Sequence, residues 1–196
     1  GFNPDDVLGS EVIEFFQFTG GATLTYGELV TRGFDIDGTP DDDIISGTNI
    51  EDRLSGARGN DLLAGGEGND GLEGGLGNDL YLHEKMGGND LIEETGGQDT
   101  LRLGEGISES KVKLYRSRDD LLVDLSGSDG SVTIKGWFAS GANIVERIEF
   151  ANGTAWDADY IRNHLHSGSA PKPKYDDDDH DQGHHHDRND HHDKTD

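Results

Sequence analysis

The sequence predicts an all-β solenoid, in which short strands and glycine-rich loops alternate through the middle of the chain. Aspartates recur there nine residues apart, with one spacing of eleven, as Asp43, Asp52, Asp61, Asp70, Asp79, Asp90 and Asp99. An apolar residue follows each aspartate by two positions, as Ile45, Leu54, Leu63, Leu72, Tyr81, Ile92 and Leu101. A single repeat has no core of its own, so these apolar residues can be buried only if successive turns stack.

Three of the repeats carry a recognisable motif. GGEGNDGLE at 65–73 and GGLGNDLYL at 74–82 match the pattern GGxGxDxUx in full, where U is a large apolar residue, and GARGNDLLA at 56–64 nearly matches it. At these residues the chain resembles the repeats-in-toxin (RTX) family. The resemblance implies a parallel β-roll with calcium ions between neighbouring loops.

The residues themselves also indicate calcium. Ca²⁺ takes about six to eight oxygen ligands in flexible geometry, and a loop with several glycine-freed carbonyls and one carboxylate supplies about half of them. Because consecutive repeats alternate sides, each loop is expected to face the second loop after it, as Asp61 would face Asp79. Stacked carboxylates would repel one another without a cation. This repulsion disfavours the alternative that the loops are only solvated turns.

The resemblance implies a ligand set of carboxylates and loop carbonyls for about three to five Ca²⁺ ions. This set is Asp43, Asp52, Gly56, Gly59, Asp61, Gly65, Gly66, Gly68, Asp70, Gly74, Gly75, Gly77, Asp79, Gly88, Asp90, Gly97 and Asp99. The pattern is weakest at its two ends. Asp41 and Ile50 replace the fourth-position glycine of the first two repeats, and Lys85 and Glu94 replace the first-position glycine of the last two.

The composition limits the classes of protein to which the chain can belong. It has 41 acidic and 16 basic residues, a formal net charge of -25 and only 31% hydrophobic residues. Such a chain is close to the disordered class until a cation neutralises it, so we expect folding to wait for metal. The acidity argues against nucleic acid and anionic lipid as partners. Cysteine is absent, and no apolar run is long enough to span a membrane.

The segment after the repeats reads as a β-meander. In residues 111–138, apolar and polar residues alternate across two turns. The apolar face of residues 107–166, which includes Trp137, Phe150 and Trp156, is expected to cap the C-terminal end of the roll, because terminal repeats of a solenoid need capping. The alternative is that these aromatic residues line a ligand site. The resemblance implies that such a flank nucleates folding after export.

A second kind of internal repeat lies outside the nonapeptides. Residues 14–29 align without a gap on residues 146–161, and both read as strand, tight turn and short helix. Asn152 and Gly153 form a favoured hairpin turn, and Thr25 with Glu28 forms a capping box. We therefore expect the chain to begin in the tail of one unit and to come from a longer tandem array.

The end of the chain is acidic and rich in histidine. Its histidines could hold zinc, nickel or copper, but no spacing among them fixes a closed tetrahedral set, and a disordered tail or linker is favoured. These histidines are His180, His184, His185, His186, His191 and His192. The expected organisation is an end of a preceding flank-like unit at 1–33, a β-roll at 34–106, a capping flank at 107–166, and this tail at 167–196.

The sequence does not predict an enzyme. Neither HExxH nor GxSxG occurs, and no pair of carboxylates is singled out as acid and base. Gly66, Gly68 and Gly71 satisfy GxGxxG, but without the strand and helix of a dinucleotide site.

Two classes of function remain. We favour a calcium-dependent folding and secretion module of a bacterial RTX toxin or surface adhesin, which would be exported by the type I secretion machinery and be secreted or lie on the cell surface. The alternative is an accessory calcium-binding module of a secreted epimerase, lipase or protease whose catalytic domain lies elsewhere. Neighbouring sequence would separate the two, because a catalytic domain would indicate the enzyme.

Overall fold

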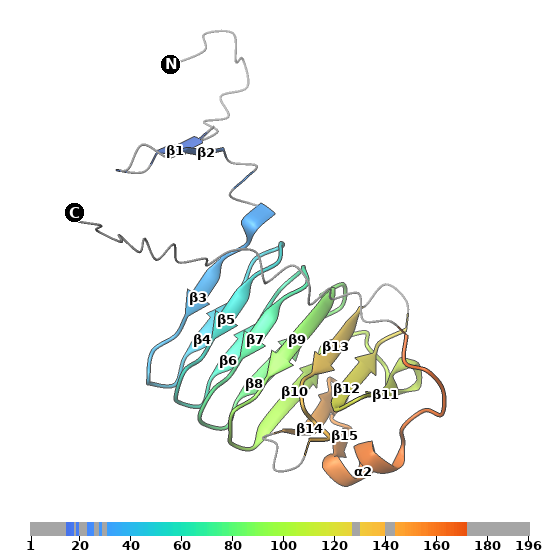
Figure 1. Cartoon of the computed structure of the whole chain (residues 1–196). Coiled ribbons are helices and arrows are strands. Elements are labelled where there is room, and N and C mark those ends of the chain that lie inside the picture. Colours follow the sequence, from blue (N-terminus) through green and yellow to red (C-terminus); the bar gives the residue numbers. More distant parts are fainter. Residues whose placement is uncertain are drawn as a thin grey trace, which may run out of the picture.

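The fold is a roll of two parallel sheets that is extended at one end by further strands (Figure 1). This structure is a computed structural model, and it describes residues 15–17, 19, 23–25, 28, 31–126, 130–139 and 144–171. Within these residues, no helix is long and apolar enough to cross a membrane. The prediction of an all-β parallel roll is confirmed.

Each of the two large sheets contains strands from the repeats and strands from the segment that follows them. In spatial order, the first sheet contains β3 (Asp35–Asp37), β5 (Arg53–Ser55), β7 (Gly71–Glu73), β9 (Asn89–Glu93), β13 (Ser131–Ile134), β12 (Asp120–Asp124) and β11 (Lys113–Ser117). The second contains β4 (Ile44–Ser46), β6 (Leu62–Ala64), β8 (Leu80–His83), β10 (Asp99–Leu103), β14 (Val145–Phe150) and β15 (Ala155–Asp157).

Strands of the repeats enter the two sheets alternately, so each strand pairs with the strand one full turn later. β5 pairs in parallel with β7, and β6 with β8. This register places Leu54 beside Leu72 and Leu63 beside Tyr81. The prediction that each loop faces the second loop after it is therefore confirmed.

The core of the roll is one side chain wide in each three-residue strand. Side chains alternate along a strand, so the middle residue of a three-residue strand points inward and its two neighbours point outward. Leu63 and Tyr81 are fully buried, whereas Ile44, at the outward position beside Ile45, is 81% exposed. Stacking of these single residues produces a continuous apolar column, which explains why one repeat alone could not fold.

The longer spacing between Asp79 and Asp90 is absorbed in a turn. Lys85 and Met86 form this turn between β8 and β9, and Met86 has a positive φ of 66°. Beyond the turn, Leu72 still pairs with Ile92. The two extra residues therefore lengthen one loop without changing the face that each strand buries.

The segment after the roll, which we call the flank (residues 107–166), continues both sheets. The antiparallel strands β11, β12 and β13 form the expected meander, and β13 pairs in parallel with β9. In the other sheet, β14 pairs in parallel with β10 and antiparallel with β15. Helix α2 (Ala158–Asn163) follows, and its N-cap Asp157 accepts a hydrogen bond from the Tyr160 backbone. Trp137, Ile148 and Ile161 of the flank are buried in the same apolar cluster as the roll.

The aligned segment at the start of the chain forms the same hairpin. β1 (Phe15–Gln17) pairs antiparallel with β2 (Thr23–Thr25). Phe15 pairs with Thr25 just as Arg147 pairs with Asp157, which is the register that the gap-free alignment requires. Thr25 and Glu28 form the predicted capping box, because each accepts a hydrogen bond from the backbone N–H of the other, at 3.1 Å and 2.7 Å. Most of residues 1–33 and all of residues 172–196, with the histidine-rich sequence, lie outside the described residues.

Candidate metal centre

The repeat aspartates form two hydrogen-bonded ladders, one along each edge of the roll. We call the loops that carry Asp43, Asp61, Asp79 and Asp99 the first edge, and those that carry Asp52, Asp70 and Asp90 the second edge. In each ladder, Oδ1 of one aspartate accepts the backbone N–H of the aspartate one turn earlier. Oδ1 of Asp79 accepts from Asp61 at 2.8 Å, and Oδ1 of Asp99 accepts from Asp79 at 2.7 Å.

The ladder buries carboxylates that would otherwise be solvated. Asp61, Asp70, Asp79 and Asp99 are each no more than 2% exposed. Burial disfavours the charged form and raises the pKa of Asp70 to about 7, an effect that the neighbouring Asp90 and Asp52 carboxylates increase and the Asp52 backbone N–H opposes. Burial likewise raises the pKa of Asp99 to about 7. The folded roll therefore holds its carboxylates in a state that a cation would stabilise.

The repeats fall into two groups, according to whether the second carboxylate oxygen of their aspartate, Oδ2, has a hydrogen-bond partner. Four buried atoms, which are Oδ2 of Asp61, Asp70, Asp79 and Asp99, have no hydrogen-bond partner among the described residues. An unpartnered buried carboxylate oxygen is costly, and it is also the kind of ligand that a hard cation such as Ca²⁺ prefers. Each of these four atoms therefore fits the role of a calcium ligand.

In the first two repeats, the second oxygen accepts hydrogen bonds from a threonine. Oδ2 of Asp43 accepts from the backbone N–H and the hydroxyl of Thr39 at 2.6 and 2.9 Å. Oδ2 of Asp52 accepts from the same groups of Thr48 at 2.6 and 2.7 Å. Both threonines stand at the second position of the motif, and their hydrogen bonds to Oδ2 distinguish the first two repeats from the last, where the hydroxyl of Thr95 donates to the carbonyl of Gly75 instead.

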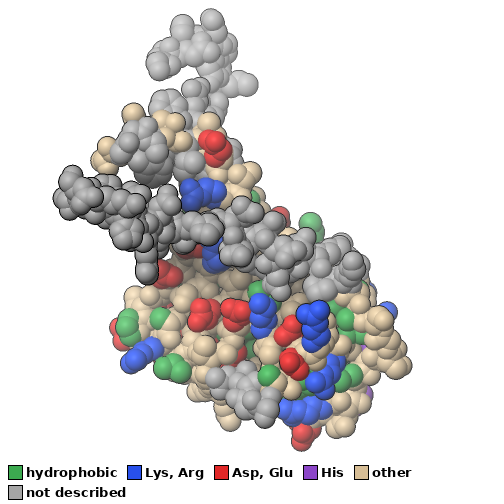
Figure 2. Space-filling view, viewed as in Figure 1, with side chains coloured by type: hydrophobic (Ala, Val, Ile, Leu, Met, Phe, Trp, Pro, Cys, Tyr) green, Lys and Arg blue, Asp and Glu red, His purple; other side chains and the backbone are tan. Residues whose placement is uncertain are grey.

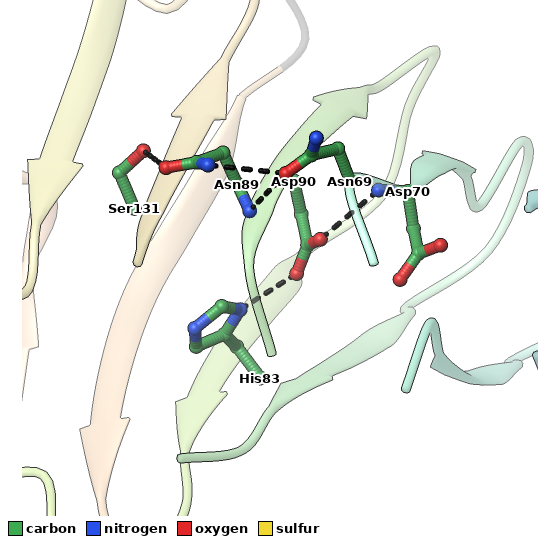
Figure 3. Close-up of polar contacts among 6 residues, drawn as sticks. All are labelled: Asn69, Asp70, His83, Asn89, Asp90 and Ser131. Atoms are coloured by element: carbon green, nitrogen blue, oxygen red, sulfur yellow. Dashed lines mark hydrogen bonds and ion pairs between the residues drawn. The ribbon is translucent and has the colours of Figure 1, made fainter. Parts of the chain in front are cut away.

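Asp90 is satisfied in a different way, by a buried histidine (Figure 3). His83 Nδ1 lies 2.6 Å from Asp90 Oδ2, and the two side chains are 2% and 3% exposed. Burial raises the pKa of Asp90, and the contact with His83 opposes that shift. The other oxygen of Asp90 accepts the backbone N–H of Asp70 at 3.1 Å, as in the rest of the ladder. Sequence reasoning missed His83, although it directly precedes the longer loop.

A parallel ladder of amides lies beside the aspartates of the second edge. Asn69 Oδ1 accepts hydrogen bonds from the backbone and the side chain of Asn89 at 2.9 and 3.0 Å. The Ser131 hydroxyl lies 3.0 Å from Asn89 Oδ1, to which it donates (Figure 3). The flank therefore continues this ladder beyond the last loop of the second edge.

The predicted glycine ligands line the inside of the stacked loops. At Gly56, Gly65 and Gly74, an added Cβ would collide with Oδ2 of the aspartate in the same repeat. A second group has positive φ, and an added Cβ there would collide with backbone of the loop one turn earlier; this group is Gly59, Gly66, Gly68, Gly75, Gly77, Gly88 and Gly97. The loops thus approach one another more closely than side chains would permit.

One group of carboxylates was not anticipated. Asp79, Glu94 and Asp99 each offer an oxygen, and these oxygens all lie within 4.8 Å of one another. Glu94 was noted in the sequence only as a departure from glycine. Its pKa is raised, chiefly by burial and despite the Tyr81 hydrogen bond.

A shallow groove on the outer face of the first sheet is lined by charged side chains of both signs. Figure 2 shows acidic and basic side chains close together on the visible face. In the groove, Arg53 pairs with Asp35 at 2.5 Å and Lys135 with Glu93 at 3.4 Å. These pairs join neighbouring strands, so they account for the charges as contacts within the sheet.

Comparison with known families agrees with this geometry. Residues 46–81 match the model of the RTX calcium-binding nonapeptide repeat (4 copies). Residues 120–160 match the model of the haemolysin-type calcium binding protein related domain, which lies in the flank. No curated protein matches the chain.

Two solved structures are similar to the chain. The extracellular lipase LipA from Serratia marcescens is 21% identical with a TM-score of 0.30, over 64% of this chain and 21% of that chain. The AlgE6R3 subunit from the Azotobacter vinelandii mannuronan C5-epimerase is 22% identical with a TM-score of 0.29, over 71% of this chain and 92% of that one. The chain thus spans about a fifth of the length of the lipase chain.

Proposed function

Because its roll carries RTX calcium-binding nonapeptide repeats, we propose that this chain is a calcium-dependent folding module of a protein exported by type I secretion. The parent protein is an RTX toxin or a surface adhesin, and the module works outside the exporting cell. The repeat region is a calcium-binding structural module, and the proposal gives it no catalytic step.

The observation that carries the proposal is the set of four buried, unpartnered aspartate oxygens. We assign the ion-binding carboxylates to Asp61, Asp79 and Asp99 on the first edge and to Asp70 on the second. Carbonyls of the stacked glycine loops supply further oxygens, which suits the about six to eight ligands of Ca²⁺. When bound, the ion supplies positive charge between carboxylates of successive turns.

In this proposal, three aspartates bind calcium more weakly than the four above, and these are Asp43, Asp52 and Asp90. Their second oxygens already accept hydrogen bonds from Thr39, Thr48 and His83. An ion at Asp90 would compete with the contact to buried His83, whose loss costs free energy, and ions at Asp43 and Asp52 would compete with two hydrogen bonds each from the exposed Thr39 and Thr48. The expected number of tightly bound ions is therefore about three, at the lower end of the range that the repeats imply.

Calcium binding and folding are one process in such a module. The chain has a formal net charge of -25, and each three-residue strand of the roll buries only one residue. The open chain does not hold the four carboxylates together, so the free energy of ion binding becomes free energy of folding. Where free calcium is low, the chain stays unfolded and can be threaded through an export channel. Where calcium is high, it folds.

A tandem array is the second part of the proposal. It is supported by the hairpin β1–β2, which repeats the register of β14–β15, and by the two N-caps, Thr25 and Asp157, which occupy equivalent positions. In the flank, β14 of this hairpin pairs with the last roll strand, β10. We propose that β1 belongs to a flank of the same kind, which would cap a preceding roll.

Circular dichroism of the full chain tests the folding proposal. We expect a disordered spectrum with chelator and a β-rich spectrum with calcium at about millimolar concentration. Magnesium at the same concentration should substitute poorly, because it demands tighter octahedral geometry and retains its waters. Identical spectra with chelator and with calcium would refute the proposal.

A further inference from the structure

Glu94 occupies a position that glycine holds in the other turns of the first edge. The first residue of the repeat is Gly38, Gly56 and Gly74 in the earlier loops and Glu94 in the last. At Gly56 and Gly74, an added Cβ would collide with the aspartate oxygen that faces the loop interior. A side chain at this position is therefore directed toward the aspartates.

The carboxylate of Glu94 meets two aspartates whose second oxygens have no other partner. Oxygens of Asp79, Glu94 and Asp99 lie within 4.8 Å of one another. Asp79 and Asp99 are 2% and 1% exposed, and Oδ2 of each is buried without a hydrogen bond among the described residues. The cluster thus combines three acidic groups with two buried oxygens that require a donor or a cation.

Tyr81 holds Glu94 in place. Its hydroxyl accepts the backbone N–H of Gly74 at 2.7 Å, so its single proton is directed to Oε2 of Glu94. The other oxygen of Glu94 accepts the backbone N–H of Thr95 at 2.9 Å. A carboxylate has about four lone-pair sites, so these contacts orient Glu94 and leave it able to bind a cation. Tyr81 is also the one tyrosine among the inward apolar positions of the seven repeats.

We propose that Glu94 is a calcium ligand and that Asp79, Glu94 and Asp99 form a three-carboxylate site that binds its ion more tightly than the other sites of the roll. This inference rests on the proposed function, because it takes the repeats to bind calcium. Three carboxylates leave a negative charge beside a bound divalent ion, whereas two are neutralised by it. The site therefore favours trivalent cations over Ca²⁺ more strongly than a two-carboxylate site does.

The three-carboxylate site lies next to the flank. The backbone N–H of Asp99 donates to Oε2 of Glu146 at 2.7 Å, so the flank takes the place of a further aspartate in the ladder of the first edge. Ion binding at this site orders the last loop of the first edge, which adjoins the flank, together with the loop one turn earlier. We expect it to fill first when the chain is titrated with calcium.

Terbium, a hard trivalent cation whose luminescence is sensitised by nearby aromatic rings, is a suitable probe for the full chain. The variant Glu94→Gln removes one charge and keeps the size of the side chain, and Glu105→Gln is a matched control at an exposed turn. In the wild type and in the control, we expect one tight terbium step before the others. In Glu94→Gln, that step should weaken about tenfold or more, and its preference for terbium over calcium should fall.

Comparing the losses of terbium and calcium affinity distinguishes a residue that binds the ion from a residue that only supports the fold. Loss of structural support would weaken terbium and calcium equally, and that result would overturn the proposal, as would a titration of Glu94→Gln identical to the wild type. Tyr81→Phe keeps the charge and should weaken the tight step without lowering the preference for terbium. Circular dichroism of the same samples distinguishes failure of the proposed function from failure of this inference. If the wild type does not fold with calcium, the proposed function fails. If it folds but Glu94→Gln titrates as the wild type does, only the inference about Glu94 fails.

Discussion

Each repeat aspartate uses its two carboxylate oxygens differently. Oδ1 accepts a backbone N–H from the preceding turn in every rung of the ladder, for example at 2.8 Å between Asp61 and Asp43. Oδ2 is either unpartnered, as in Asp61, or satisfied by the protein, as in Asp43. Substitution by asparagine separates the two roles, because it can retain an accepting oxygen for the ladder while it removes the charge.

We expect Asp79→Asn to weaken calcium binding about tenfold or more, and Asp43→Asn to have little effect. Asp79 has an unpartnered second oxygen and lies between two other such aspartates of the first edge, whereas Asp43 already accepts two hydrogen bonds from Thr39. Isothermal titration calorimetry of both variants measures this difference. Equal losses at the two positions would contradict the division of the aspartates into two groups.

The raised carboxyl pKa values predict a dependence on pH. In the metal-free fold, burial raises the pKa of Asp70 and of Asp99 from 3.8 to about 7. The folded chain then binds these protons more tightly than the unfolded chain, so acidification from about pH 7 toward pH 4 should stabilise the metal-free fold. Calcium needs the ionised carboxylates, so at an acidic pH where the metal-free chain is folded, calcium should bind with release of protons.

Proton release on calcium addition, measured in weakly buffered solution near pH 5 once circular dichroism has shown that the metal-free chain is folded there, checks the same coupling. A pH-independent affinity, or no release of protons, would show that these carboxyls are already ionised in the metal-free chain.

At the scale of elements, the stacking of loops depends on glycines that no side chain can replace. Gly77 has a φ of 142°, and an added Cβ there would collide with the carbonyl oxygen of Gly59 one turn earlier. Gly136 also has a positive φ, of 64°, but an added Cβ there would meet nothing within 4 Å. Substitutions at the two glycines therefore distinguish the free-energy cost of the backbone conformation, which both would share, from the cost of moving the loops apart, which only Gly77 would carry.

We expect Gly136→Ala to destabilise the calcium-bound fold by about 1 kcal/mol, the usual cost of a left-handed conformation for alanine. Gly77→Ala should raise the calcium concentration needed for folding by far more, because the two loops must move apart and the ion site between them is disrupted. Calcium titrations followed by circular dichroism compare the variants. A similar, small effect at both positions would mean that the loops are not stacked this closely.

The elements could be predicted from the sequence, whereas part of the site could not. A strict repeat fixes strand, loop and inward residue together, so β5 to β8 follow from the motif, and alternation of apolar residues predicts the meander after it. The sequence did not indicate the roles of His83, Thr39 and Thr48. Each of these residues contacts the second oxygen of an aspartate, and which oxygen a side chain reaches is known only from the folded geometry. Glu94 was seen only as a departure from glycine, since its contact with Asp79 exists only after the turns have stacked.

At the scale of the whole molecule, the roll and the flank share one core. Leu101 and Leu103 of β10 pair with Ile148 and Phe150 of β14, and all four belong to the same buried cluster. Without β14, the last strand of the second sheet would expose this apolar surface and an open edge. Each three-residue strand of the roll adds only one inward side chain, so the flank supplies the largest block of buried surface on which the final turns can order.

This arrangement predicts that the flank starts the folding of the roll. Deletion of residues 137–165 removes β14, β15 and α2 but leaves all seven repeat aspartates and Glu94, so a defect cannot be attributed to lost loop ligands. We expect this variant to remain unfolded with calcium, or to need about tenfold more calcium than the full chain, because the loops around Asp90 and Asp99 lose their buried support.

Deletion of residues 172–196 is the matched control for that experiment, since it removes a similar number of residues and none of those that the structure describes. Circular dichroism over a calcium series measures the folding midpoint of both variants, and the control should match the full chain. If the variant without residues 137–165 folds at the same calcium concentration as the full chain, the repeats alone carry the calcium switch. Order would then have to spread from within the roll, where the unpartnered oxygens of Asp61, Asp70 and Asp79 lie, and the flank would follow as a consequence of folding.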